Sequence, residues 1–261
     1  MECQNITKNL KINKDKSIGE IVIVVEGESE EFKLLKHIFT NVLDYNYVPL
    51  KRNKTIRDSF TSKTNKNSTV IVANTSNSNI KSILNDEEYK DKLYTLLAND
   101  YHKSLKNTPI YILWDRDRDS NDKAFVKKSL EKFSNSLDND NYEMNGILLL
   151  SYPCIEIYEI SNFNKRLWKN TFTSSKDVKK YKKELSISIE NITEKTLLLA
   201  HENMHRILLE FGIYEYDPSN FKNINNKIFT KMEEIYKNNK YILPLSLISV
   251  MLVDLGIIEP K

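Results

Sequence analysis

The sequence predicts an α/β fold in which helices flank a mostly parallel sheet. Short runs of β-branched residues alternate with helical patterns up to about residue 160, and only helical patterns follow. Strands that alternate with helices of about 10 to 15 residues are typical of β-α-β units, whose helices cover both faces of a parallel sheet. We therefore predict an α/β domain over residues 1–160 and an all-helical C-terminal subdomain over residues 161–261.

Four apolar runs are predicted to be buried strands, because they show no polar alternation. They are residues 21–25 (IVIVV), 69–73 (TVIVA), 110–114 (IYILW) and 147–151 (ILLLS). Apolar residues at helical spacing predict helices at about 29–43, 79–97 and 122–136 in the first part, and at 176–185, 193–211, 223–238 and 243–255 in the second. Between the first two strands, residues 51–68 are polar.

Composition excludes several classes of protein. Hydrophobic residues make up 40% of 261 positions and charged residues 29%, as in a globular protein. The polar start lacks the apolar core of a signal peptide, and Pro244 and Asp254 interrupt the apolar stretch 241–258, so no membrane span is expected. The two cysteines, Cys3 and Cys154, form no metal or disulfide framework, so we expect a cytoplasmic protein. The net charge of +3 neither indicates nor excludes nucleic acid.

Acidic residues follow three of the predicted strands. Glu26 ends the first strand, Asp115, Asp117 and Asp119 follow the third, and Glu156 comes shortly after the fourth. The carboxyl ends of neighbouring parallel strands open into one crevice, so these side chains are expected to converge. Gathered carboxylates repel one another unless a hard cation such as Mg²⁺ or Mn²⁺ compensates them. Acids at strand ends also occur by chance in a chain so rich in charge.

Three motifs together resemble the TOPRIM domain, which topoisomerases, bacterial primases and OLD-family nucleases share. The first is VVEGESEEF at 24–32, and the second, YILWDRDRDS at 111–120, looks like the triple-Asp form of its motif. The third, SYPCIEIY at 151–158, is similar to a motif of RloB-like proteins, with Tyr152 where Asn is common and Tyr158 where Trp is common. The resemblance covers roughly residues 20–160, with a longer insert between the first two motifs than in a minimal domain.

The resemblance implies a TOPRIM-type nuclease that needs Mg²⁺ or Mn²⁺ and cleaves phosphodiester bonds of RNA, tRNA included, or of DNA. By the family's pattern, Asp115 and Asp117 would hold the metal, and Glu26 would be a further ligand or the general acid/base. Asp119 is a further candidate ligand, and Glu30 and Glu156 are second-tier candidates. Related proteins are associated with anti-phage defence beside an ATPase. This chain has no P-loop motif, so that ATPase would be a separate chain.

Two basic runs are candidate nucleic-acid contacts, because a nuclease must neutralise phosphates. The residues concerned are Lys51, Arg52, Lys54 and Arg57 in the first run, and Lys179 and Lys180 in the second. A solvated helix face has the same composition, so neither run is decisive alone. The sequence leaves the oligomeric state open.

Alternatives from other classes remain. A TOPRIM-like module could bind nucleic acid or a partner without cutting, although the intact acids argue against this. A zinc metalloprotease is suggested by His201, Glu202 and His205, which form HExxH in a helical pattern. Arg206 then follows where that motif prefers an apolar residue, and no HxxGxxH arrangement continues it. The third ligand would have to be a Glu such as Glu210, Glu233 or Glu234. The Asp-x-Asp pair also resembles the motif of HAD phosphatases, but Asp119 stands where Thr or Val is expected.

Overall fold

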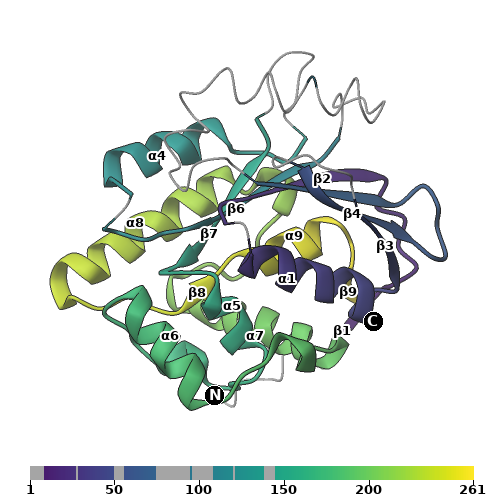
Figure 1. The fold of residues 1–261 in the computed structure, drawn as a ribbon. Coiled ribbons are helices and arrows are strands. Elements are labelled where there is room, and N and C mark those ends of the chain that lie inside the picture. Colours follow the sequence, from purple (N-terminus) through teal and green to yellow (C-terminus); the bar gives the residue numbers. More distant parts are fainter. Residues whose placement is uncertain are drawn as a thin grey trace.

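A computed structural model of the chain describes residues 9–27, 29–49, 56–74, 95, 108–119, 121–137 and 145–261. In these residues, helices flank a seven-stranded sheet whose spatial order is β3-β4-β5-β2-β6-β7-β8 (Figure 1). Its strands are β2 (Glu20–Val25), β3 (Tyr45–Pro49), β4 (Ile56–Ser62), β5 (Thr69–Asn74), β6 (Ile110–Asp115), β7 (Ile147–Tyr152) and β8 (Leu245–Ser246). The predicted α/β class, with helices flanking a sheet that has a parallel core, is confirmed.

The four predicted strands form this parallel core. β2 lies between β5 and β6, and β7 lies on the far side of β6, all four running in the same direction. The first of these strands along the chain is thus central, with the second on one side and the third and fourth on the other. From β2 the chain adds β5 on one side of the sheet, and it then crosses back to add β6 and β7 on the other side, so the strand order reverses between β2 and β6. This reversal is a topological switch point, where open α/β sheets bind ligands beyond the carboxyl ends of their strands.

The helices on the two sides of the sheet come from both halves of the chain. They are α1 (Glu30–His37), continued by the π-helical turn η2 (Ile38–Val42), then α4 (Lys123–Lys132), α5 (Glu156–Ser161), α6 (Ser175–Glu184), α7 (Glu194–Glu210), α8 (Lys222–Asn239) and α9 (Ile248–Asp254). Short 3₁₀ turns are η4 (Leu167–Lys169), η5 (Ile189–Asn191) and η6 (Pro218–Asn220). Figure 1 shows α1 and α4 on opposite sides of the sheet. In the residues described, no helix has the length and apolar character that a membrane crossing requires.

β2 shows why the apolar runs become central strands. Its five β-branched residues, Ile21–Val25, are all almost completely buried, because β5 and β6 flank it and helices cover its faces. β-branched side chains suit this setting, since they lose little rotamer freedom on a pleated surface. The predictions for the helices at 29–43, 122–136, 176–185, 193–211 and 223–238 are also confirmed by α1 with η2, α4, α6, α7 and α8. The helix predicted at 79–97 lies outside the described residues, apart from position 95.

The polar segment 51–68 contains a strand that the sequence pattern did not predict. β4 pairs antiparallel with β3 on one side and with β5 on the other, and so extends the sheet. The polar residues of β4 give no strand pattern in the sequence. Phe60 of this strand is nevertheless fully buried and stacks on Phe39, with ring centroids 5.5 Å apart. Asp58 is buried too, and it accepts a 2.7 Å hydrogen bond from the Tyr47 hydroxyl. Pairing between strands therefore overrides local composition here.

The prediction that the C-terminal part is all-helical is wrong in two places. β8 pairs antiparallel with β7, so the helix predicted at 243–255 begins only at Ile248 of α9. Pro244 stands directly before β8, and the Ser246 hydroxyl hydrogen-bonds that of Ser151 at 2.8 Å. The second exception is β9 (Ile258–Pro260), a strand near the C-terminus. It pairs antiparallel with β1 (Leu10–Ile12) near the N-terminus.

The two predicted parts of the chain share one hydrophobic core. The cluster contains Val24 of β2 and Leu149 of β7 together with Leu208 of α7 and Leu252 of α9. The boundary at residue 160 stays a prediction. The elements on both of its sides pack around the same sheet.

We expect Gly146→Ala to destabilise the fold more than Gly19→Ala. Both glycines have positive φ, which costs an alanine about 1 to 2 kcal/mol. A Cβ on Gly146 would also lie 2.7 Å from the Ile110 carbonyl oxygen, whereas one on Gly19 would meet nothing within 4 Å. Relieving that overlap is expected to cost about 1 to 3 kcal/mol more. Urea unfolding of the two variants measures the difference, and equal losses would contradict the close packing of β7 on β6.

Candidate active site

Two predicted site residues meet at the switch point of the sheet. Glu26 follows the last residue of β2, and Asp115 is the last residue of β6. The two strands are neighbours, with Val25 paired to Leu113. The backbone N–H of Asp115 donates to Oε2 of Glu26 at 3.3 Å, although 89 positions separate the two residues. Their predicted proximity is confirmed.

Glu31 joins this pair, and the sequence reasoning missed it. Its side chain is only 8% exposed, although it lies in the first turn of α1. A Cβ on Gly27 would overlap the Glu31 carboxylate, so the missing side chain at Gly27 makes room for it. Burial raises the pKa of Glu31, and the charges of Glu156 and Glu30 raise it further. The space beside Gly27 is therefore occupied by the Glu31 carboxylate.

A signal for Glu31 was present in the helical pattern. Glu31, Leu34, Leu35 and Ile38 follow the spacing i, i+3, i+4, i+7 and form one buried stripe. A charged residue on such a stripe is an exception that needs a partner or a function.

The third motif brings Glu156 to the same place. Glu156 begins α5 and is 6% exposed. Burial holds the pKa of Asp115 well above its ordinary value, and the charges of Glu26, Glu31 and Glu156 add to the effect. The backbone of Ile155 opposes this rise by hydrogen bonding to Asp115. The three motifs of the sequence therefore act on one another electrostatically.

We call Glu26, Glu31, Asp115, Asp117 and Glu156 the acidic cluster. Burial raises the pKa of Glu26 to about 7, with smaller contributions from the charges of Glu31 and Asp117. Removal from water and repulsion between like charges both favour the protonated carboxyl. A bound cation would reverse both effects, because it stabilises the ionised form.

The loop after β6 presents the other two acids of the second motif. The Asp119 backbone N–H donates to Oδ1 of Asp117 at 3.2 Å, and Asp119 itself is exposed. Asp117, Arg118 and Asp119 line a pocket of about 360 Å³. Its other walls are the residues Pro153, Thr173, Ser174, Ser175, Lys176, Tyr236 and Ile242. A groove that includes the start of α6 therefore adjoins the acidic cluster.

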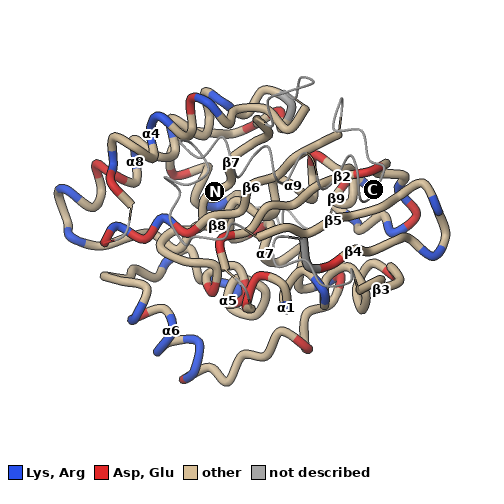
Figure 2. Tube along the Cα trace, turned by 45° about the horizontal axis from the view of Figure 1, so that its top comes forward, with Lys and Arg blue, Asp and Glu red and all other residues tan. Residues whose placement is uncertain are grey.

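Lysines of α6 border the acids of α5. Lys179 lies 3.4 Å from Oε1 of Glu156, and Lys182 lies 2.6 Å from Oε2 of Glu159, which is fully buried. Lys180 is exposed and its amine is 3.9 Å from Glu184. Figure 2 shows the basic positions along α6 and acidic positions around α1 and α5. Lys182 and Glu159 were not among the predicted residues.

The remaining predicted residues lie apart from the cluster or outside the described residues. Glu30 is half exposed and its nearest cation is Lys33, at 3.1 Å, so it lies at the rim. Arg57 belongs to β4, and nothing is described of its side chain. The other predicted phosphate contacts, Lys51, Arg52 and Lys54, lie outside the described residues.

The donor set of the acidic cluster suits a hard divalent cation, because it consists only of carboxylate oxygens. Burial, and to a lesser extent repulsion between the carboxylates, raises the pKa values of Glu26, Glu31 and Asp115. Yet in the described part of the chain no three Asp, Glu, His or Cys side chains are grouped closely enough to hold a metal ion. The donor type therefore suits Mg²⁺ or Mn²⁺, whereas the side chains as they lie do not form a complete ligand set.

The HExxH helix has a different character. His201 is buried, and burial together with the neighbouring His205 lowers its pKa to about 4. The two rings lie 6.3 Å apart, and Glu202 forms a 3.1 Å ion pair with Arg206. Across the ranges that the structure describes, no third potential ligand is grouped with the two histidines. The zinc-protease alternative therefore lacks a complete ligand set there.

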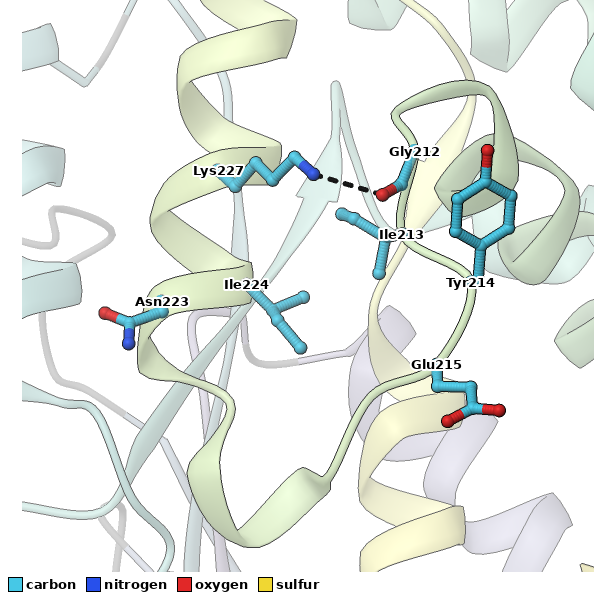
Figure 3. Close-up of a pocket in the computed structure, with 7 residues that line it drawn as sticks. All are labelled: Gly212, Ile213, Tyr214, Glu215, Asn223, Ile224 and Lys227. Carbon is cyan, nitrogen blue, oxygen red and sulfur yellow. Dashed lines mark hydrogen bonds between the residues drawn. The ribbon is translucent and has the colours of Figure 1, made fainter.

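A further pocket, of about 400 Å³, lies between the end of α7 and the start of α8 (Figure 3). Lys227 donates to the carbonyl oxygen of Gly212 at 3.1 Å across it. Of the seven residues that line it, only Glu215 is acidic. It shares no residue with the acidic cluster and is not a candidate for the same chemistry.

Comparisons of the chain with protein-family models, with curated proteins and with solved structures find no match.

We expect Glu26→Gln to stabilise the metal-free protein at pH 8 but not at pH 5. Between pH 4.5 and about 7 the folded protein keeps a proton on Glu26 that the unfolded chain has lost, so the wild-type free energy of unfolding falls as pH rises through this window. The full shift corresponds to about 3 kcal/mol, and partial solvent access reduces the expected gain to ~2 kcal/mol.

Urea unfolding at the two pH values in EDTA measures this difference. The matched control is Glu234→Gln, which alters a half-exposed glutamate whose amine partner, Lys231, is 3.3 Å away. A Glu26→Gln gain that is the same at both pH values would contradict the raised pKa.

Proposed function

We propose that the protein is a TOPRIM-type nuclease that uses Mg²⁺ or Mn²⁺ to cleave phosphodiester bonds of RNA or DNA. The observation that carries this proposal is the acidic cluster at the switch point of the parallel sheet, where Asp115 hydrogen-bonds Glu26. Clustered and buried carboxylates cost free energy, and such a cost is typical of functional sites. The order of the three motifs along the chain supports the same conclusion.

The residues have separate roles in this proposal. Asp115 and Asp117 would hold the ion, Asp119 would assist from the loop, and Glu26 would serve as a further ligand or as the general acid/base. When bound, the cation polarises the phosphate and stabilises charge on the leaving oxygen. Glu31, which is buried in the first turn of α1, would be an additional carboxylate in this set.

The surface beside the cluster is suited to a polyanion. α6 carries exposed Lys176, Lys179, Lys180 and Lys183, and its start borders the pocket that contains Asp117. Lysines supply sequence-independent attraction to phosphates. We propose α6 as the element that guides the nucleic acid toward the acids. A cytoplasmic anti-phage role beside a separate ATPase chain rests on the family resemblance.

We expect cleavage to need both a divalent cation and Asp115. Purified protein is incubated with mixed tRNA, single-stranded DNA and plasmid, with Mg²⁺ or Mn²⁺ or EDTA. Asp115→Asn should lose more than about 100-fold in rate, because altering the partners of metal ligands alone costs about 10- to 100-fold. Glu234→Gln removes a charge without touching the cluster and should cleave as the wild type does.

Different results point to different functions. Equal cleavage by Asp115→Asn and the wild type would place the chemistry elsewhere. Nucleic-acid binding without cleavage, weakened by charge removal on α6, would favour the non-cleaving module. Stoichiometric zinc in the purified protein would revive the His201/His205 alternative.

A further inference from the structure

Three charged side chains with little exposure form ion pairs at the loop that carries Asp115 and Asp117. Arg116 follows Asp115 directly and is 2% exposed, and Glu233 of α8 is 6% exposed. Arg118 lies two positions further along the loop and is mostly buried. None of the three is a member of the acidic cluster, and burying charge requires close compensation.

One carboxylate compensates both arginines. Oε1 of Glu233 lies 3.1 Å from Nη2 of Arg116 and 2.7 Å from Nη2 of Arg118. Oε2 of Glu233 accepts a third bond from Nη1 of Arg118 at 3.0 Å. The Arg118 pairing is thus bidentate, the geometry that gives an arginine–carboxylate pair its orientation. We call these residues the Arg–Glu–Arg triad.

Further contacts fix the loop on both sides of the triad. The Arg118 guanidinium stacks 3.9 Å from the ring centroid of Tyr236, one helical turn beyond Glu233. Nη1 of Arg116 donates to the carbonyl oxygen of Asn121 at 2.8 Å, and Nδ2 of Asn121 donates to the carbonyl oxygen of Asp115 at 3.1 Å. The arginine side chain and the backbone of Asp115 are therefore tied into one bonded loop.

α8, which carries Glu233 and Tyr236, is itself held in place by contacts with the sheet and with α4. Nδ2 of Asn225, two turns before Glu233, donates to the carbonyl oxygen of Leu148 in β7 at 2.7 Å. α8 also packs against α4. Glu233 is thus anchored to β7, the strand that pairs with β6 and ends beside the third motif.

The sequence alternates acids and arginines through this loop, Asp115-Arg116-Asp117-Arg118-Asp119. Arg116 and Arg118 stand on either side of Asp117, and Arg116 also follows Asp115 directly. Holding both arginine side chains therefore restrains the short backbone segment that carries the two acids.

We propose that Glu233 is a positioning residue for the acidic cluster, which sets the direction of the Asp115 and Asp117 carboxylates by holding Arg116 and Arg118. This inference rests on the proposed function. It makes α8, in the C-terminal part of the chain, a component of the active site. Binding of the cation, and not only the stability of the fold, depends on it.

The test compares Glu233→Gln with Glu233→Asp and with Glu234→Gln on the same helix. Mn²⁺ affinity is measured by calorimetry and by electron paramagnetic resonance, alongside kcat and KM for the cleaved nucleic acid. Glu233→Gln should weaken Mn²⁺ binding about 10- to 100-fold and lower kcat with little change in KM, as expected when a partner of metal ligands is altered. Glu233→Asp keeps the charge and should recover part of the loss, and Glu234→Gln should match the wild type.

A second variant separates positioning from stability. Apolar residues of similar volume often replace a buried ion group without loss of stability, so Arg116→Met/Arg118→Met/Glu233→Leu should fold even where Glu233→Gln does not. If this folded triple variant binds Mn²⁺ as weakly as expected for Glu233→Gln, the inference is supported.

The inference is overturned if the folded triple variant, or a folded Glu233→Gln variant, keeps wild-type Mn²⁺ affinity and kcat. In that case the nuclease function still stands. A wild-type protein that neither binds Mn²⁺ nor cleaves nucleic acid would overturn the proposed function, and the positioning role with it.

Discussion

Repulsion between carboxylates is the constraint on which the carboxyl edge of the sheet depends. Glu26, Glu31 and Asp115 are held at pKa values above their ordinary range because burial and mutual repulsion act together. A fold keeps such groups together only if the rest of the structure bears the cost. Lys179 reduces the repulsion at the rim, because its amine pairs with Glu156. In the proposed function, a bound cation would offset the remaining cost at the centre of the site.

The parallel core explains how residues far apart in the chain meet there. β2 and β6 end at the same level, so the residues just beyond them become neighbours whatever the length of the chain between them. The insert that carries β3 and β4 extends the sheet on the opposite side of β5 and leaves this meeting undisturbed. That arrangement accounts for a long insert between two motifs that lie side by side.

The features that could be predicted from the sequence are those with a local signal. Uninterrupted apolar runs predicted the four parallel strands, and strand ends predicted the proximity of Glu26 and Asp115. β4 and β8 were missed, because partner strands rather than their own composition make them strands. Glu31 had a signal in its helical stripe, whereas nothing in the sequence links Glu233 to Arg116 and Arg118, which lie 117 and 115 positions away. Charge pairing over such separations is decided by the fold alone.

The change of sequence pattern near residue 160 therefore does not divide the groups around the carboxylates, which come from both sides of it. Residues before it supply the acids, and residues after it supply the groups that surround them: Lys179 and Lys182 on α6 and Glu233 on α8. Glu233 holds the loop through Arg116 and Arg118, and the lysines form ion pairs with the acids of α5. A carboxylate cluster needs control of both its charge and its direction. In this protein the two controls come from separate helices of the C-terminal part, and this gives that part a role beyond completing the core.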